Sequence, residues 1–171
     1  TLRLIGRLNP LPAIVINDYF DIIAANAAYE AMCGLQFAAL PPAERNYLAL
    51  TLTDPVWQRF LMVEAAADLE RRLQRLVGML RGVGARRPQD ATLAARIAGF
   101  RAMSPAFDLA WSRETVAQPE EVLFSFLHAR LGPITLKKQI WHNCNGETSG
   151  RLNVYHPRED ADYDRLASVG V

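Results

Sequence analysis

The sequence predicts an α+β fold in which one antiparallel sheet is covered by helices on one face. Two β-branched runs come first, segments with strict apolar alternation come last, and helical periodicity fills the middle. Strands that gather at both ends of a chain, with helices inserted between them, favour an antiparallel sheet over a parallel one. We therefore expect two strands, a helical insert and three more strands.

The composition is that of a soluble globular domain. The chain has 171 residues, of which half are apolar and 22% are charged, which is enough for one hydrophobic core. Nineteen basic against eighteen acidic side chains give too little net charge to bind nucleic acid unaided. Apolar runs such as LPAIVI are too short to span a membrane, and the two cysteines lack a CxxC motif and fit a reducing cytoplasm.

The first two strands are predicted at 13–17 and 21–25, where AIVIN and DIIAA flank a turn. Asn26 follows directly and is a good helix N-cap. Gly34 provides a good stop for the short helix that begins there. The chain is therefore expected to open with a hairpin and a helix.

The central part of the chain is predicted to be helical. A short helix is expected to end before Pro55, because the residue that precedes a proline disfavours helix. One long amphipathic helix then runs from Pro55 until Gly82 and Gly84 end it. Three of its arginines fall outside the apolar stripe and are expected to face solvent: Arg71, Arg72 and Arg75.

Two shorter helices are expected to complete the insert. The loop 84–90 carries two arginines and is predicted to be a solvated link. An amphipathic helix follows it, and Ser104 then caps a third helix that Pro105 begins. That third helix is expected to bury Phe107 and Trp111.

Alternation with a period of two predicts the last three strands. Phe124 and Phe126 share one face of the first of them, and 134–141 alternates in the second. A final strand, RLNVYHP, places Val154 on one face and Tyr155 on the other. The charged tail that follows is predicted to be helical.

Few residues suggest catalysis or metal binding. His142, Cys144 and His156 are of the right types for a metal site or a Cys-His pair, but their spacing matches no metal motif and a turn explains them. His128 fits either a polar ligand head or a satisfied position at the end of a strand. The common phosphate, zinc and acyl-transfer motifs do not occur. We therefore predict a protein that is not an enzyme and holds no metal.

The order of several short motifs resembles that of the MmyB-like ligand-binding domain, which follows a helix-turn-helix domain in bacterial transcription regulators. The resemblance covers about Leu11 to Pro157. It departs from the family pattern at QPEEVLFSF, where members carry a basic run, and at Gln139–Trp141, where they favour a YE pair. The motifs that carry the resemblance are PAIVIN, IIAAN, PPAERN, the Asp54-Pro55 dipeptide, Leu76 to Gly82, RRPQD, SPAFDLAW, His128 and Gly132 to Leu136.

The resemblance implies a PAS-like five-stranded antiparallel sheet with a helical insert packed on one face. Residues 13–157 would form this domain, with 1–12 a linker from an N-terminal DNA-binding domain outside this sequence and 158–171 a helical tail. It implies a small apolar ligand similar to a fatty acid, no other cofactor, and contact with DNA only through the missing domain. A cytoplasmic homodimer without membrane contact is expected.

Apolar and aromatic side chains are expected to line the ligand cavity. The expected sheet side consists of Phe124, Phe126, Leu136, Ile140 and Val154, and the expected helical side of Trp57, Leu61, Phe107 and Trp111. His128 is the candidate for a polar head. Arg45 is a candidate partner for a carboxylate, because guanidinium binds carboxylates bidentately, or else braces local backbone.

Ligand entry is expected to change how the helices pack on the sheet, and so to alter the placement of two DNA-binding heads in a dimer. Two other functions stay open at this point. The first is an enzyme that acts on a lipid-like substrate in the same cavity. The second is a structural dimerisation module whose interior is filled by side chains.

Overall fold

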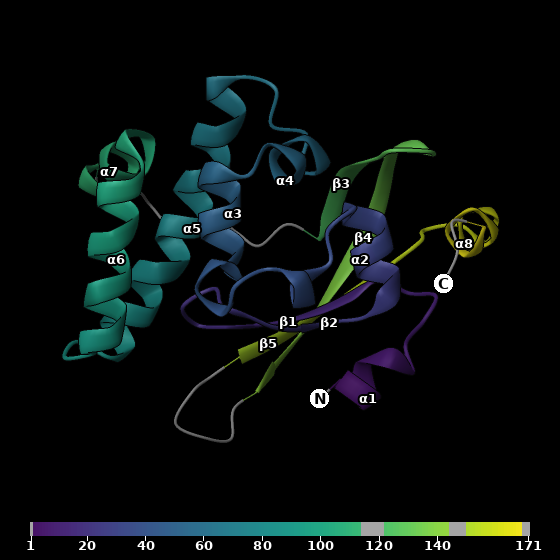
Figure 1. Ribbon diagram of the computed structural model, residues 1–171, viewed down its shortest axis with the longest axis horizontal. Coiled ribbons are helices and arrows are strands. Elements are labelled where there is room, and N and C mark those ends of the chain that lie inside the picture. The colour runs from purple at the N-terminus through teal and green to yellow at the C-terminus, as the bar shows by residue number, and fades with distance from the viewer. Residues whose placement is uncertain (1, 114–121, 144–149, 169–171) are drawn as a thin grey trace.

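A computed structural model describes residues 2–113, 122–143 and 150–168 of the chain. Its strands form one antiparallel sheet in the order β2-β1-β5-β4-β3. Helices cover one face of this sheet (Figure 1), which confirms the predicted PAS-like α+β fold. The strands are β1 (Ala13–Asn17), β2 (Ile22–Ala25), β3 (Leu123–His128), β4 (Gly132–Asn143) and β5 (Gly150–His156).

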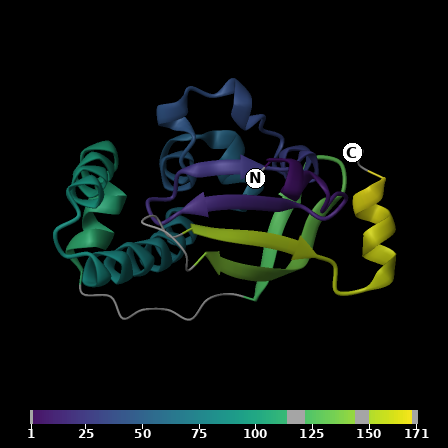
Figure 2. The same cartoon turned by 90° about the horizontal axis from the view of Figure 1, so that it is seen from below.

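The helices fall into an insert and two terminal segments. The insert comprises α2 (Ala27–Cys33), α3 (Tyr47–Thr53), α4 (Pro55–Phe60), α5 (Ala66–Arg86), α6 (Ala91–Met103) and α7 (Pro105–Ser112), with short 3-10 turns at Phe37–Ala39 and Pro42–Glu44. The terminal segments are α1 (Leu2–Gly6) and α8 (Asp160–Ala167). Figure 2 shows the sheet with α6 and α7 beyond one end and α8 beyond the other.

Asn26 fixes the first hairpin to α2, as its N-cap pattern predicts. Its side-chain oxygen accepts hydrogen bonds from the backbone N–H groups of Tyr29 at 3.0 Å and Ala13 at 2.9 Å. Its amide nitrogen donates to the carbonyl oxygens of Leu11 at 2.8 Å and Ile5 at 3.3 Å. One buried side chain, directly after β2, therefore joins α1, β1 and α2.

The single long helix predicted from Pro55 to Gly82 is wrong, because the structure divides it into α4 and α5. Met62 adopts a left-handed backbone conformation with φ of 56°, which ends α4. Asp68 then accepts hydrogen bonds from the N–H groups of Glu64 and Ala65, and so caps a new helix. The predicted stop at the glycines is also wrong, since α5 continues through Gly82 to Arg86.

The helices α6 and α7 begin where the sequence predicts. Ser104 caps α7 by accepting a hydrogen bond from the N–H of Phe107 at 3.3 Å. Asp90 caps α6 in the same way, with the N–H of Leu93 as donor at 2.9 Å. The two helices lie side by side next to α5, away from the sheet (Figure 1).

The core lies between the sheet and the helices and is largely aromatic. Trp57 is at its centre, with ring centroids 5.2 Å from Tyr47 and 5.3 Å from Phe60. Phe60 stacks on Phe126 of the sheet at 4.7 Å. The alternation predicted for the last strands is confirmed, because the residues of β3 and β4 that face the helices include Phe126 and its partner Ile134.

Three polar contacts tie the turn between β1 and β2 to the corner between α5 and α6, and we name them the corner contacts. Asp18 pairs with Arg87 at 3.0 Å, and Asp21 pairs with Arg96 at 2.9 Å. The Tyr19 hydroxyl donates to Asp90 at 2.7 Å. The loop that we expected to be a solvated link therefore holds one end of α5 to the sheet.

Candidate ligand-binding pocket

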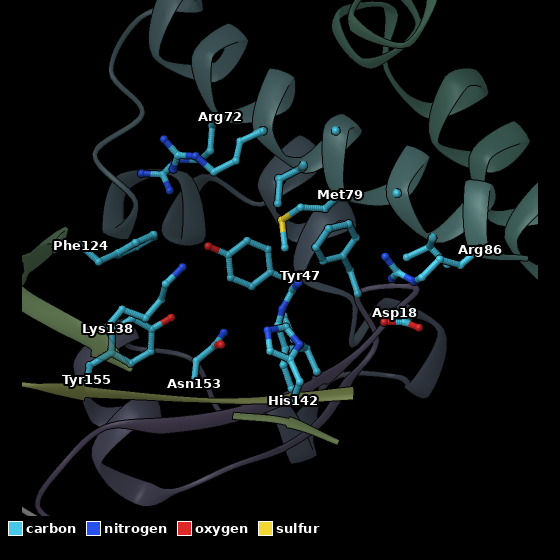
Figure 3. Close-up of a pocket in the computed structure, with 18 residues that line it drawn as sticks. Asp18, Tyr47, Arg72, Met79, Arg86, Phe124, Lys138, His142, Asn153 and Tyr155 are labelled. Atoms are coloured by element: carbon cyan, nitrogen blue, oxygen red, sulfur yellow. The ribbon is translucent and has the colours of Figure 1, made fainter. Parts of the chain in front are cut away.

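A cavity of about 320 Å³ lies between α5 and the helix-covered face of the sheet. Figure 3 shows side chains from both walls pointing into it. Its size is at the lower end of the range of small-molecule sites. The cavity is lined by Ile16, Asp18, Phe20, Tyr47, Arg72, Arg75, Leu76, Gly78, Met79, Gly82, Val83, Arg86, Phe124, Lys138, His142, Arg151, Asn153 and Tyr155.

One face of α5 forms the helical wall. Arg72, Arg75, Met79, Gly82 and Arg86 recur every three or four residues, so they lie along the same side of the helix. The glycine contributes no side chain and leaves space, while the side chain of Met79 points into the cavity (Figure 3). The apolar stripe of α5 packs into the core beside this face.

Alternate residues of β4 and β5 form the sheet wall. Lys138 is paired with Tyr155 in the sheet register, and His142 is paired with Arg151. Asn153 lies between the two pairs on β5 and is 5% exposed. Because successive strand residues point to opposite faces, this set faces α5 as a group.

The cavity lining is strongly basic. Five side chains are cationic, and of the described lining residues Asp18 is the one with a carboxylate. The guanidinium of Arg72 lies 5.2 Å from the centre of the Phe124 ring, and the ammonium of Lys138 lies 5.8 Å from the same ring. Arg151 is similarly placed 5.2 Å from the ring of Phe20. The aromatic rings of the pocket thus serve as cation–π partners.

Two tyrosine hydroxyls add neutral hydrogen-bonding groups to the pocket. Burial raises the pKa of Tyr47, whose ring is also part of the core around Trp57. Burial likewise raises the pKa of Tyr155. Desolvation disfavours the phenolate in both cases, so the two groups stay protonated and can donate a hydrogen bond at neutral pH.

Of the predicted sheet-side residues, Phe124 lines this cavity. Phe126, Leu136 and Ile140 share its face of the sheet but lie outside the lining. Val154 is on the opposite face, because it alternates with the lining residues of β5 and pairs with Ala13 and Gln139.

The four predicted helical-side residues are part of the packed interior and do not line the cavity. Trp57 and Leu61 are buried where α4 meets the core, and the indole N–H donates to Thr51 at 3.2 Å. Phe107 and Trp111 lie on α7, stacked at 6.1 Å, and Arg81 of α5 covers the Trp111 ring at 5.4 Å.

The structure places the two polar candidates, Arg45 and His128, in local backbone networks. Arg45 donates from Nε to the carbonyl of Leu40 at 2.8 Å and from Nη2 to that of Ala38 at 3.0 Å, which is the bracing alternative. His128 Nδ1 accepts the N–H groups of Arg130 and Leu131, both at 3.1 Å, in the turn before β4. Neither residue lines the cavity.

The buried position of His128 predicts a pH dependence of stability. Desolvation lowers the pKa of this imidazole below its ordinary value near 6.5, so the unfolded chain binds the proton more readily than the folded one. The free energy of unfolding should therefore decrease as the pH falls from about 7.5 to about 5.5. Urea unfolding across this range should give a shallower pH dependence for His128→Gln, and equal slopes would contradict the assignment.

The described residues among those considered for catalysis are His142 and His156, which lie at opposite ends of the paired strands β4 and β5. Within residues 2–113, 122–143 and 150–168, no three metal-binding side chains come together. His142 lines the cavity, His156 lies at the end of β5, and Cys144 falls outside the described residues. In the same parts of the chain, no helix is long and apolar enough to cross a membrane.

Our sequence reasoning missed the basic residues of the helical wall. Arg72 and Arg75 were expected on the solvent side, whereas they are half-buried and line the cavity; Arg86 lines its rim and is exposed, as expected. A signal was present, because these arginines share one helical face with two small residues, Gly78 and Gly82. Glycines on the same helical face as the arginines leave space beside the helix, which is typical of a cavity wall and not required of a face in solvent.

Comparison with known proteins identifies the family of this chain. A search of curated proteins found no match. The family model of the MmyB-like transcription regulator ligand binding domain matches residues 1–168, which is longer than the stretch over which the motifs showed the resemblance. Because the match covers nearly the whole chain, the protein belongs to the MmyB-like family of ligand-binding domains of transcription regulators.

Proposed function

We propose that this chain is a sensor domain whose cavity binds a small molecule with an apolar, fatty-acid-like body. Binding would modulate the affinity for DNA of a helix-turn-helix domain N-terminal to this chain, in a cytoplasmic homodimer. The observation that carries the proposal is the cavity of about 320 Å³ between α5 and the sheet. A structural dimerisation module with a filled interior does not account for that cavity.

The apolar part of the lining supports a ligand with a hydrocarbon body. Ile16, Phe20, Met79 and Val83 come from three different elements and meet along the cavity. Burial of a ligand methylene group against such side chains contributes about 0.8 kcal/mol. A short acyl chain would therefore bind through these contacts.

Helix α5 would carry the response, because its two sides have different partners. One side lines the cavity, while Arg81 donates to the carbonyls of Trp111 at 2.6 Å and Arg113 at 2.7 Å, at the end of α7. A ligand that binds more tightly to the protein when α5 is in one position than in another would shift α5 to the first position. The helices α6 and α7 would then move together with α5. The size of this population shift is limited by the difference between the affinities of the ligand for the two conformations.

Occupancy of the cavity is tested by native mass spectrometry of the purified protein before and after organic extraction. Release of a small acyl compound would support the proposal and identify the ligand class. A mass equal to that of the bare chain, combined with no binding of octanoate by calorimetry, would contradict it.

The regulatory part is tested with the complete regulator. Octanoate should change its affinity for operator DNA by about 10-fold, a usual size for allosteric coupling. Met79→Trp should remove this response by filling the cavity, while Met103→Trp should retain it because Met103 is exposed on α6. Equal operator affinity with and without octanoate would contradict the role in regulation.

A further inference from the structure

The side chain of Asn153 reaches the cavity from the middle of β5. The residue is 5% exposed, and Figure 3 shows its amide directed into the cavity next to Tyr155. Within the described parts of the chain, its side-chain oxygen Oδ1 is buried and accepts no hydrogen bond. A buried carbonyl oxygen without a donor is unfavourable, because it has given up its hydrogen bonds to water. An acceptor so placed in a cavity wall is a candidate contact for a ligand.

The neighbours of Asn153 on this face of the sheet leave its oxygen unpaired. Directly opposite it lie Ile14 on β1 and Ile140 on β4, whose side chains are apolar and offer no donor. Arg151 and Tyr155 flank it along β5 on the same face, since alternate residues of a strand point the same way. Neither of these two donates to Oδ1. The donor that would satisfy this oxygen therefore has to come from a molecule in the cavity.

The other polar atom of the Asn153 side chain is used within the protein. A side-chain hydrogen bond joins Asn153 to Tyr155. Because Oδ1 has no partner, the amide nitrogen makes this bond and donates to the hydroxyl oxygen of Tyr155. The bond orients the amide before a ligand arrives and leaves Oδ1 as the atom available in the cavity. A group that is already oriented loses less side-chain entropy when it binds a ligand.

We propose that Asn153 accepts a hydrogen bond from the ligand, so that the apolar body of the ligand carries a neutral O–H or N–H donor. A hydroxyl or an amide supplies such a donor, whereas a carboxylate at neutral pH only accepts. Asn153 then determines specificity, because a site that would leave its acceptor unpaired rejects similar molecules that lack the donor. This inference rests on the proposed function, since it describes the ligand of the same cavity.

The test compares two pairs of neutral probes that differ in the donor. 1-Octanol and 1-methoxyheptane are isomers, and the alcohol alone has an O–H group. Octanamide and 2-nonanone differ by an amino group in place of a methyl group. In calorimetry with the purified protein, the donor-bearing probe of a pair should bind at least about 10-fold more tightly than its partner. A preference in either pair supports the inference and identifies the donor as a hydroxyl or an amide.

Asn153→Leu should remove this preference, because leucine is similar in size and has no acceptor. The ratio of the two affinities within a pair should fall below about 3-fold, while the donor-free probe should bind no more weakly than it does to the wild type. Asn153→Val is a second variant, with the β-branching that favours a strand. Gln139→Leu is the matched control, since it removes an exposed amide from the opposite face of the sheet, and it should retain the wild-type ratios.

The outcomes separate the donor inference from the proposed function. If octanoate binds and neither pair shows a preference, the inference is overturned and the apolar sensor stands. If no probe binds, octanoate included, the proposed function is overturned together with the inference. If the preference persists in both Asn153 variants, another acceptor receives the hydrogen bond and the assignment to Asn153 is overturned. A folding defect would weaken both probes of a pair alike, so the ratios remain informative.

Discussion

Replacement of Trp57 by alanine should lower the free energy of unfolding by about 3–5 kcal/mol, as for other buried aromatic residues. Trp57 has no exposed surface, and its ring lies 5.2–5.9 Å from those of Tyr47, Phe60 and Phe37. These neighbours belong to three separate segments, so they cannot collapse together into the space. Urea unfolding should show a lower midpoint with an unchanged slope.

Trp141→Ala is the matched control for this prediction. Trp141 is 47% exposed and lies on the face of the sheet that the helical insert leaves uncovered. Its loss should change the free energy of unfolding by no more than about 1 kcal/mol. Equal effects of the two substitutions would mean that the aromatic cluster around Trp57 is not the centre of the core.

Replacement of Asn26 by alanine should destabilise the protein by about 3 kcal/mol, because it removes an N-cap and three other hydrogen bonds at once. The N–H of Ala13 and the carbonyl of Leu11 would lose buried partners at 2.9 Å and 2.8 Å. A buried polar group without a partner costs more than the bond itself contributes. Thermal and urea unfolding should both report the loss.

Ser104→Ala separates the capping part of this effect from the rest. Ser104 caps α7 with one hydrogen bond, to the N–H of Phe107, so its loss should cost about 1 kcal/mol. The difference between the two variants measures what Asn26 contributes by joining α1 and the first hairpin. If Asn26→Ala costs no more than Ser104→Ala, those additional bonds do not contribute to stability.

Elements that depend on local chemistry could be predicted from the sequence. The caps at Asn26 and Ser104 act on backbone N–H groups three residues away, so the local sequence is sufficient to predict them. Alternation in β3 and β4 is equally local. The division between α4 and α5 could not be predicted, because the conformation of Met62 interrupts an apolar spacing that continues across it.

The site was harder to predict than the fold, because it depends on which face of the sheet packs against which face of α5. The sequence correctly put Val154 and Tyr155 on opposite faces of β5, but both faces carry apolar residues, so it did not show which one the helices cover. Arginines are usually at the surface. Arg72 and Arg75 line a cavity because the sheet lies opposite them. This arrangement is set by the tertiary structure and not by the local sequence.

The corner contacts have a mechanical consequence for α5. Asp18–Arg87 and Tyr19–Asp90 hold the C-terminal end of this helix against the sheet, whereas Arg72 lies near its N-terminal end. The helix is therefore held at its C-terminal end. A ligand that displaces the N-terminal end, where Arg72 lies, would rotate α5 about the corner contacts. Helix α7 packs on α5 and α6 packs on α7, so a displacement of α5 would reach α7 first and α6 through it.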